Sequence, residues 1–158
     1  MRYARINEFD VANGPGIRTS IFLTGCTLHC RGCFNEHLQS FTAGKPFDNV
    51  ALAELLTYSQ NDRICGISIL GGEPFDQDKD ELIKLLTTLK QKVGKPIWVW
   101  TGHTFEELIK DEKNIEALKC IDVLIDGPFK LDERDSKLLY RGSRNQRVLN
   151  MKELLEGK

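Results

Sequence analysis

The sequence predicts an α/β protein in which a mainly parallel sheet forms an incomplete (β/α) barrel. Four short runs of β-branched and aromatic residues alternate with segments of helical periodicity, the order expected of right-handed βαβ units. The runs lack clean polar and apolar alternation, as expected for strands covered on both faces. A complete eightfold barrel needs roughly 200 residues or more. The chain has 158 residues, so we expect a single domain over residues 1–158 with only part of a barrel.

The expected strands end at Gly, Thr or Asp. They cover residues 19–23, 64–70, 96–100 and 121–125. Helical patterns cover residues 50–58 and 78–93 and begin again after Thr104, where Thr104-Phe-Glu-Glu107 is a capping box. The caps expected for the first two are Asp48 or Asn49, and Asp76 or Asp78.

In parallel sheets of this kind, ligands bind beyond the carboxyl ends of the strands. Four loops occupy those positions here. They are Thr-Gly-Cys at 24–26, Gly-Gly-Glu-Pro at 71–74, Thr-Gly-His at 101–103 and Asp-Gly-Pro-Phe at 126–129. We therefore expect the functional residues in these loops.

Composition excludes several broad classes of function. The formal net charge is -1, from 22 basic and 23 acidic residues, which gives no general reason to expect nucleic acid or a membrane surface as partner. No apolar run approaches the ~20 residues that cross a bilayer. The first ten residues carry two arginines and two acids, unlike a signal or transit peptide. We expect a cytoplasmic protein.

The five cysteines form one cluster and two isolated positions. In a reducing compartment, clustered cysteines indicate metal binding or catalysis rather than disulfides. Cys65 and Cys120 stand apart in apolar contexts, and for both we expect buried structural thiols.

The clustered cysteines, Cys26, Cys30 and Cys33, allow three interpretations. The i, i+4, i+7 spacing would place small core residues on one helix face, but Gly25 and Gly32 disfavour a helix. Zinc could bind the three cysteines with a histidine. The histidine would be His37, or less conveniently His29. The third interpretation is an iron–sulfur cluster, as a 4Fe-4S cluster with three cysteine ligands leaves one iron open to a small ligand.

Two motifs, each after a strand, together resemble the radical S-adenosylmethionine (SAM) superfamily. They are Cys26-x-x-x-Cys30-x-x-Cys33 and Gly71-Gly72-Glu73-Pro74. Within that superfamily, Gly-Pro-Gly-Ile-Arg at 14–18 is similar to the activases of glycyl radical enzymes. Three further segments resemble the activases of anaerobic ribonucleoside-triphosphate reductase. They are residues 97–108, 122–129 and 141–148.

This resemblance implies a barrel of the radical SAM type and a specific reaction. A 4Fe-4S cluster, reduced by a donor such as reduced flavodoxin, would cleave SAM and so generate a glycyl radical on the reductase. Pyruvate formate-lyase or another glycyl radical enzyme is the alternative partner. From a different class, the alternatives are a zinc-binding structural module and an iron–sulfur electron carrier. No residue is expected to be catalytic beyond the cluster itself.

The resemblance also implies which residues hold the cofactors. Cys26, Cys30 and Cys33 would bind three irons, and the fourth iron would bind SAM. Gly32, Cys33 and Phe34 would flank SAM, although Phe34 could instead be a core aromatic. The backbone of Gly72 and Glu73 would contact the methionine part of SAM.

Three further features have weaker assignments. Asp126 could accept a hydrogen bond from the ribose, or could instead cap a helix or turn. Arg141, Arg144 and Arg147 could reach a carboxylate of SAM or of the partner, or could simply be solvated. His103 is expected to be a loop residue without chemistry.

Overall fold

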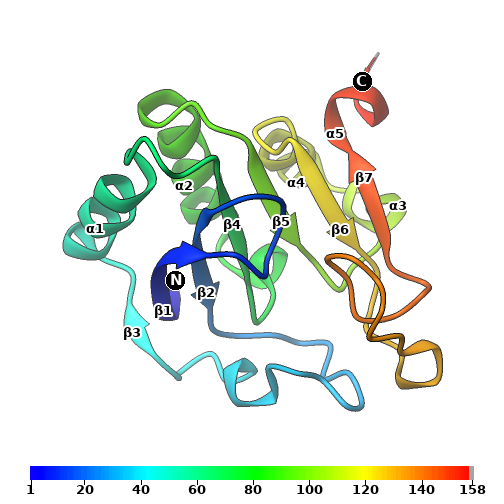
Figure 1. The fold of residues 1–158 in the computed structure, drawn as a ribbon. Coiled ribbons are helices and arrows are strands. Elements are labelled where there is room, and N and C mark those ends of the chain that lie inside the picture. Colours follow the sequence, from blue (N-terminus) through cyan, green and yellow to red (C-terminus); the bar gives the residue numbers. More distant parts are fainter. Residues whose placement is uncertain (157–158) are drawn as a thin grey trace.

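A computed structural model describes residues 1–156 (Figure 1). Its strands are β1 Arg2–Asp10, β2 Arg18–Leu23, β3 Lys45–Pro46, β4 Gly66–Gly71, β5 Ile97–Trp100, β6 Val123–Asp126 and β7 Arg147–Asn150. Its α-helices are α1 Asn49–Ser59, α2 Lys79–Lys92, α3 Phe105–Leu108, α4 Glu112–Leu118 and α5 Met151–Leu154. Three short 3-10 helices are η1 Glu36–Leu38, η2 Pro74–Asp76 and η3 Leu131–Glu133.

The prediction of an incomplete barrel with a mainly parallel sheet is wrong. The strands form one open, mixed sheet in the order β3-β1-β2-β4-β5-β6-β7. Only β2, β4, β5 and β6, the four strands expected from sequence, run parallel to one another. The β1–β2, β1–β3 and β6–β7 pairings are antiparallel. The barrel implied by the resemblance is therefore not formed.

The antiparallel strands were missed because their sequences carry weak strand signals. β1 reads Arg-Tyr-Ala-Arg-Ile-Asn-Glu-Phe-Asp, and most of it is only half-buried. β7 is mostly exposed and directly precedes α5. Polar residues are well suited to strands near the edges of a sheet. The pairing of β1 with β2 and of β7 with β6 depends on tertiary contacts that the residues of β1 and β7 do not indicate by themselves.

The two faces of the sheet are covered differently. Ile67, Ile69, Ile97 and Val99 belong to the main core, together with the leucines of α2. In Figure 1, α2 and α4 lie behind the sheet and α1 lies at its left side, whereas the connection between β1 and β2 crosses in front of it. The front face carries a second, smaller cluster of Phe22, Leu38 and Leu70, with Trp100 packed against it.

The helix predictions are confirmed with small changes in their bounds. Asp78 caps α2 by accepting from the Glu81 N–H, and Asp48 caps α1 in the same way. Thr104 caps α3, which has only four residues. No helix in residues 1–156 is long and apolar enough to cross a membrane.

The Gly-Pro-Gly-Ile-Arg element wraps around a buried arginine. Arg18 is 2% exposed and donates to the Ser68 hydroxyl at 2.8 Å and to the carbonyls of Ile67 and Pro96 at 3.1 Å. Burial lowers the pKa of Arg18. Gly14 has φ +112°, and a Cβ there would lie 2.7 Å from the Arg18 side chain. The glycine therefore lets the turn close over the guanidinium.

The expectation of two buried structural thiols is wrong for Cys65, which is exposed, and Cys120 is half-buried. Cys65 precedes β4 and donates to the Pro15 carbonyl at 3.2 Å. Its apolar neighbour Ile64 is buried, 2% exposed, while Cys65 itself is not. The apolar sequence around Cys65 therefore indicated that a buried segment begins here, but it did not indicate that Ile64, and not Cys65, is the residue that faces inward.

Candidate functional site

A cavity of about 550 Å³ lies at the carboxyl ends of the parallel strands. It is in the size range typical of small-molecule sites. Its walls come from the loops after β2, β4 and β5, from the front face of the sheet, from the connection between β1 and β2, and from the segment that joins β6 to β7. The lining includes Cys26, Cys30, Cys33, Phe34, Gly72, Glu73, Trp100, Phe129, Tyr140 and Arg141.

The three clustered cysteines lie in an irregular loop between β2 and η1, so the helix-face interpretation is wrong. The loop is held at its base because Gly25 donates to the Leu38 carbonyl and Cys26 to the Gln39 carbonyl. Further along, the Cys33 N–H donates to the Cys30 carbonyl at 3.1 Å. All three side chains are half-buried and line the same cavity.

The three thiols are soft donors, of the kind that bind zinc or an iron–sulfur cluster. Within residues 1–156, no group of three or more His, Cys, Asp or Glu side chains is arranged to hold one metal ion. Zinc needs its ligands to converge on one point, whereas the thiolates of a 4Fe-4S cluster bind different irons. Burial raises the pKa of the Cys26 and Cys30 thiols, so binding of a metal would displace their protons.

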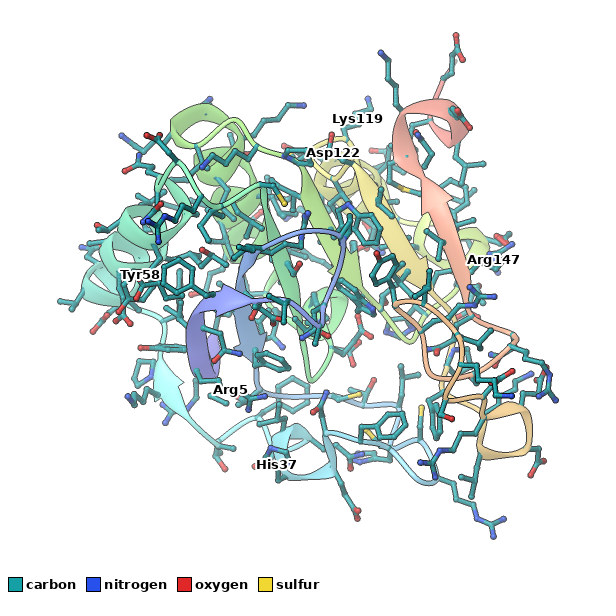
Figure 2. All side chains as sticks on the ribbon, in the orientation of Figure 1. Arg5, His37, Tyr58, Lys119, Asp122 and Arg147 are labelled. Carbon is teal, nitrogen blue, oxygen red and sulfur yellow. The ribbon has the colours of Figure 1, made fainter. Side chains whose placement is uncertain are left out.

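The two histidines considered as zinc ligands lie elsewhere. His37 is exposed, and Figure 2 shows it on η1 at the lower edge of the molecule. His37 does not line the cavity. His29 is also exposed, and its Nδ1 lies 2.9 Å from the Gln39 side-chain oxygen. Neither arrangement favours a closed site of three cysteines and one histidine.

The loop after β4 approaches the cysteine loop backbone to backbone. Gly72 donates to the Leu23 carbonyl at 2.9 Å, and Glu73 donates to the Gly25 carbonyl at 2.7 Å. A Cβ at Gly72 would lie 2.6 Å from the Gly25 carbonyl oxygen. Glycine is therefore required for this contact. The Gly72 carbonyl oxygen accepts no hydrogen bond from the part of the chain that the structure describes.

The Glu73 side chain is used within the protein. It is 1% exposed and accepts from the Thr101 hydroxyl at 2.7 Å, the Gly102 N–H at 2.6 Å and the Phe75 N–H at 2.9 Å. Burial raises the pKa of Glu73, and the three donors oppose that effect only in part. The carboxyl group joins the loops after β4 and β5. When ionised, it can only accept hydrogen bonds, and both of its oxygens already accept them from within the protein.

Asp76 makes a second connection between loops. One of its oxygens accepts from both the N–H and the hydroxyl of Thr27, each at 2.8 Å. The other lies 2.8 Å from His103 Nε2. The hydrogen bond to Asp76 raises the pKa of His103. His103 therefore has a structural partner that sequence reasoning did not find.

Phe34 and Gly32 take different places around the cavity. Phe34 is 60% exposed, and its ring lies 5.0 Å from that of Phe129, so it is not a core residue. Gly32 does not line the cavity. It has φ +74°, and a Cβ there would lie 3.0 Å from the Leu131 side chain. Gly32 thus lets the cysteine loop pack against η3.

Asp126 does not line the cavity. It is fully buried, accepts from the Phe105 N–H at 2.8 Å at the start of α3, and pairs with Arg147 across the β6–β7 ladder. Arg147 also binds Glu106 at 2.7 Å, and Figure 2 shows it where β7 begins. The carboxylate is thus engaged at the start of α3 and with Arg147, which is closer to the capping alternative than to the ribose contact.

The three arginines near the end of the chain separate in space. Arg144 is exposed, Arg147 is paired with carboxylates, and only Arg141 lines the cavity. The Arg141 Nε atom is buried and has no hydrogen-bond partner within the described residues. Trp100 and Tyr140, joined by a 2.6 Å hydrogen bond from the Trp100 indole to the Tyr140 carbonyl, also line the cavity. Trp100 lay at the end of an expected strand, whereas nothing in the sequence singled out Tyr140.

Comparison with known proteins identifies the class and then the family. Residues 12–149 match the family model described as a 4Fe-4S single cluster domain. The anaerobic ribonucleoside-triphosphate reductase-activating protein of Pasteurella multocida (strain Pm70) is 40% identical over 150 residues, covering 92% of this chain and 95% of that protein. The protein of the same name from Escherichia coli (strain K12) is 35% identical over 156 residues, covering 96% and 100%. The chain belongs to the family of anaerobic ribonucleoside-triphosphate reductase-activating proteins.

Proposed function

We propose that this protein activates anaerobic ribonucleoside-triphosphate reductase by generating a glycyl radical on it, through reductive cleavage of SAM at a 4Fe-4S cluster. The observation that carries the proposal is the meeting of three cysteine thiols and the Gly-Gly-Glu-Pro loop at one cavity of about 550 Å³. The names of the relatives supply the partner. The SAM chemistry is supported by the motifs and by this geometry.

Cys26, Cys30 and Cys33 would hold three irons of the cluster, with the fourth facing the cavity. No histidine is among the residues that line the cavity in the described part of the chain, and the Glu73 carboxyl group is already bound by three donors. These residues therefore leave the fourth position to a ligand. A reduced cluster held by these cysteines would supply one electron for the cleavage of SAM to methionine and a 5'-deoxyadenosyl radical, and hydrogen transfer from a glycine of the reductase would then give 5'-deoxyadenosine and the glycyl radical.

Two polar groups of the cavity suit the charged ends of the methionine part of SAM. The Gly72 carbonyl is an unpaired acceptor, as an ammonium group needs. Arg141 lines the cavity, and its guanidinium group is a donor of the kind that a carboxylate needs. Cys33, Phe34 and Gly72 would lie at the SAM site, and Gly32 would shape the cysteine loop beside it. Glu73 would contribute through its backbone, whereas Asp126 does not line the cavity.

Aromatic side chains around the cavity would limit the access of water. Phe22, Trp100, Phe129 and Tyr140 line the cavity beside the polar groups. Excluding water protects a reactive radical from side reactions. We further propose reduced flavodoxin or a similar protein as the electron donor. We also propose a cytoplasmic location, which the five free thiols support.

The decisive experiment combines the anaerobically reconstituted, reduced protein with SAM and the reductase. We expect a glycyl radical signal by electron paramagnetic resonance and formation of 5'-deoxyadenosine. An intact cluster without either product would refute the proposal. Stoichiometric zinc without iron or sulfide in the isolated protein would do the same.

A further inference from the structure

The three loops that follow β2, β4 and β5 are joined at Asp76. This residue ends η2, which begins at the proline of the Gly-Gly-Glu-Pro turn. Its carboxylate accepts two 2.8 Å hydrogen bonds from Thr27 in the cysteine loop and lies 2.8 Å from His103 in the loop after β5. Although burial alone would raise it, the pKa of Asp76 is lowered by these hydrogen bonds, so the group is ionised at neutral pH.

The connection acts on the residue next to a proposed cluster ligand. Thr27 follows Cys26, and both its backbone N–H and its side chain are fixed by the same carboxylate oxygen. On the other side of Cys26, the Gly25 carbonyl accepts from Glu73, and the Cys26 N–H itself donates to Gln39. The backbone around Cys26 is thus held on both sides before any metal binds.

We propose that Asp76, held by His103, is a positioning residue that fixes Thr27 and thereby sets the direction in which Cys26 presents its thiolate to the cluster. The inference rests on the proposed function only in taking Cys26 as a cluster ligand. Groups that orient the ligands of a metal commonly affect its affinity by about 10- to 100-fold. Asp76 would act through Thr27, without touching the cluster or the substrate.

The test compares variants that break this connection at different points. Asp76→Asn removes the charge, and Thr27→Val removes only the hydroxyl donor from an exposed residue. The matched control is Asp80→Asn, because Asp80 is an exposed carboxylate that pairs with Lys113 at the surface. For each reconstituted protein, one measures the rate of cluster loss to a chelator and the electron paramagnetic resonance spectrum of the reduced cluster.

We expect cluster loss to accelerate about tenfold or more in Asp76→Asn and less in Thr27→Val, with altered g-values in both. Asp80→Asn should match the wild type. His103→Ala should also accelerate the loss, and His103→Gln, which keeps a donor toward Asp76, should restore part of the stability of the cluster.

Two results would overturn the inference. One is wild-type chelation rates and spectra in both Asp76→Asn and Thr27→Val. The other is a change in the urea midpoint of the cluster-free variants that accounts for the faster loss while the spectra stay the same, since this would indicate a purely structural role. If the wild-type protein binds no iron–sulfur cluster, the proposed function fails first, so the two failures are distinguishable.

Discussion

Replacing Glu73 with glutamine tests whether its ionised carboxyl group holds the loops of the cavity together. One oxygen of Glu73 accepts from Phe75 and Thr101, and the other accepts from Gly102 at 2.6 Å. The amide of glutamine keeps one acceptor oxygen, but its NH₂ group must then face a backbone or hydroxyl donor. The substitution preserves shape and changes only hydrogen bonding and charge.

The expected cost follows from these contacts. Losing a hydrogen bond to a charged group costs about 1.5–3 kcal/mol, and removing a buried charge offsets part of that cost. We therefore expect Glu73→Gln to lower the free energy of unfolding by about 2 kcal/mol. For a chain of this size, that corresponds to a drop of about 4–8 °C in Tm.

The assay is urea unfolding of the cluster-free protein at pH 7, followed by circular dichroism. Glu116→Gln, at an exposed position on α4, is the control and should stay within about 0.5 kcal/mol of the wild type. If Glu73→Gln is equally neutral, the reasoning is refuted. Burial would then have raised the pKa of Glu73 enough to keep the neutral acid in place, since an amide replaces that form well.

Three further predictions concern the cysteines, an ion pair and pH. Cys30→Ala should abolish both the cluster absorption and the glycyl radical, whereas Cys65→Ala should leave both unchanged; cluster loss in Cys65→Ala would contradict the ligand assignment. Arg147→Ala should cost about 2 kcal/mol in urea unfolding, because buried Asp126 loses its charged partner; this is less than the roughly 3–5 kcal/mol of a fully buried pair, since solvent screens the half-exposed Arg147. An unchanged midpoint would show that the pair contributes nothing. Asp76 raises the pKa of His103, so the stability contributed by protonated His103 should be complete below about pH 6.5. It should decline as the pH rises through the folded-state pKa. The difference in urea midpoint between wild type and His103→Gln should therefore shrink at high pH, and a difference independent of pH would refute this.

The local sequence was sufficient to predict those strands and helices that are determined by residues close together in the chain. The four parallel strands and the capped helices α1 and α2 were predictable because hydrophobic runs and N-caps act within a few residues. The same holds for the cysteine loop and the Gly-Gly-Glu-Pro turn. Since the carboxyl ends of parallel strands share one edge, the sequence also predicted that these two motifs would meet.

The roles of individual side chains could not be predicted from the sequence, because they depend on tertiary packing and not on the spacing of residues along the chain. Asp126 and Glu73 both follow expected strands, yet one accepts from the first N–H of α3 and pairs with Arg147, while the other joins two loops. Of three arginines within seven positions, only Arg141 lines the cavity. The chain between β6 and β7 decides which of them faces inward.

The sequence by itself determined the chemistry available to this protein: three thiols and a glycine turn at the ends of neighbouring parallel strands. The tertiary structure alone decided that the sheet is open and mixed, because β1 and β7 gain their direction from the strands they pair with and not from their own residues. It also decided which groups remain free in the cavity. Among the described residues, neither the Gly72 carbonyl nor the Arg141 Nε has a hydrogen-bond partner, and such pairing depends on how distant loops pack rather than on local sequence.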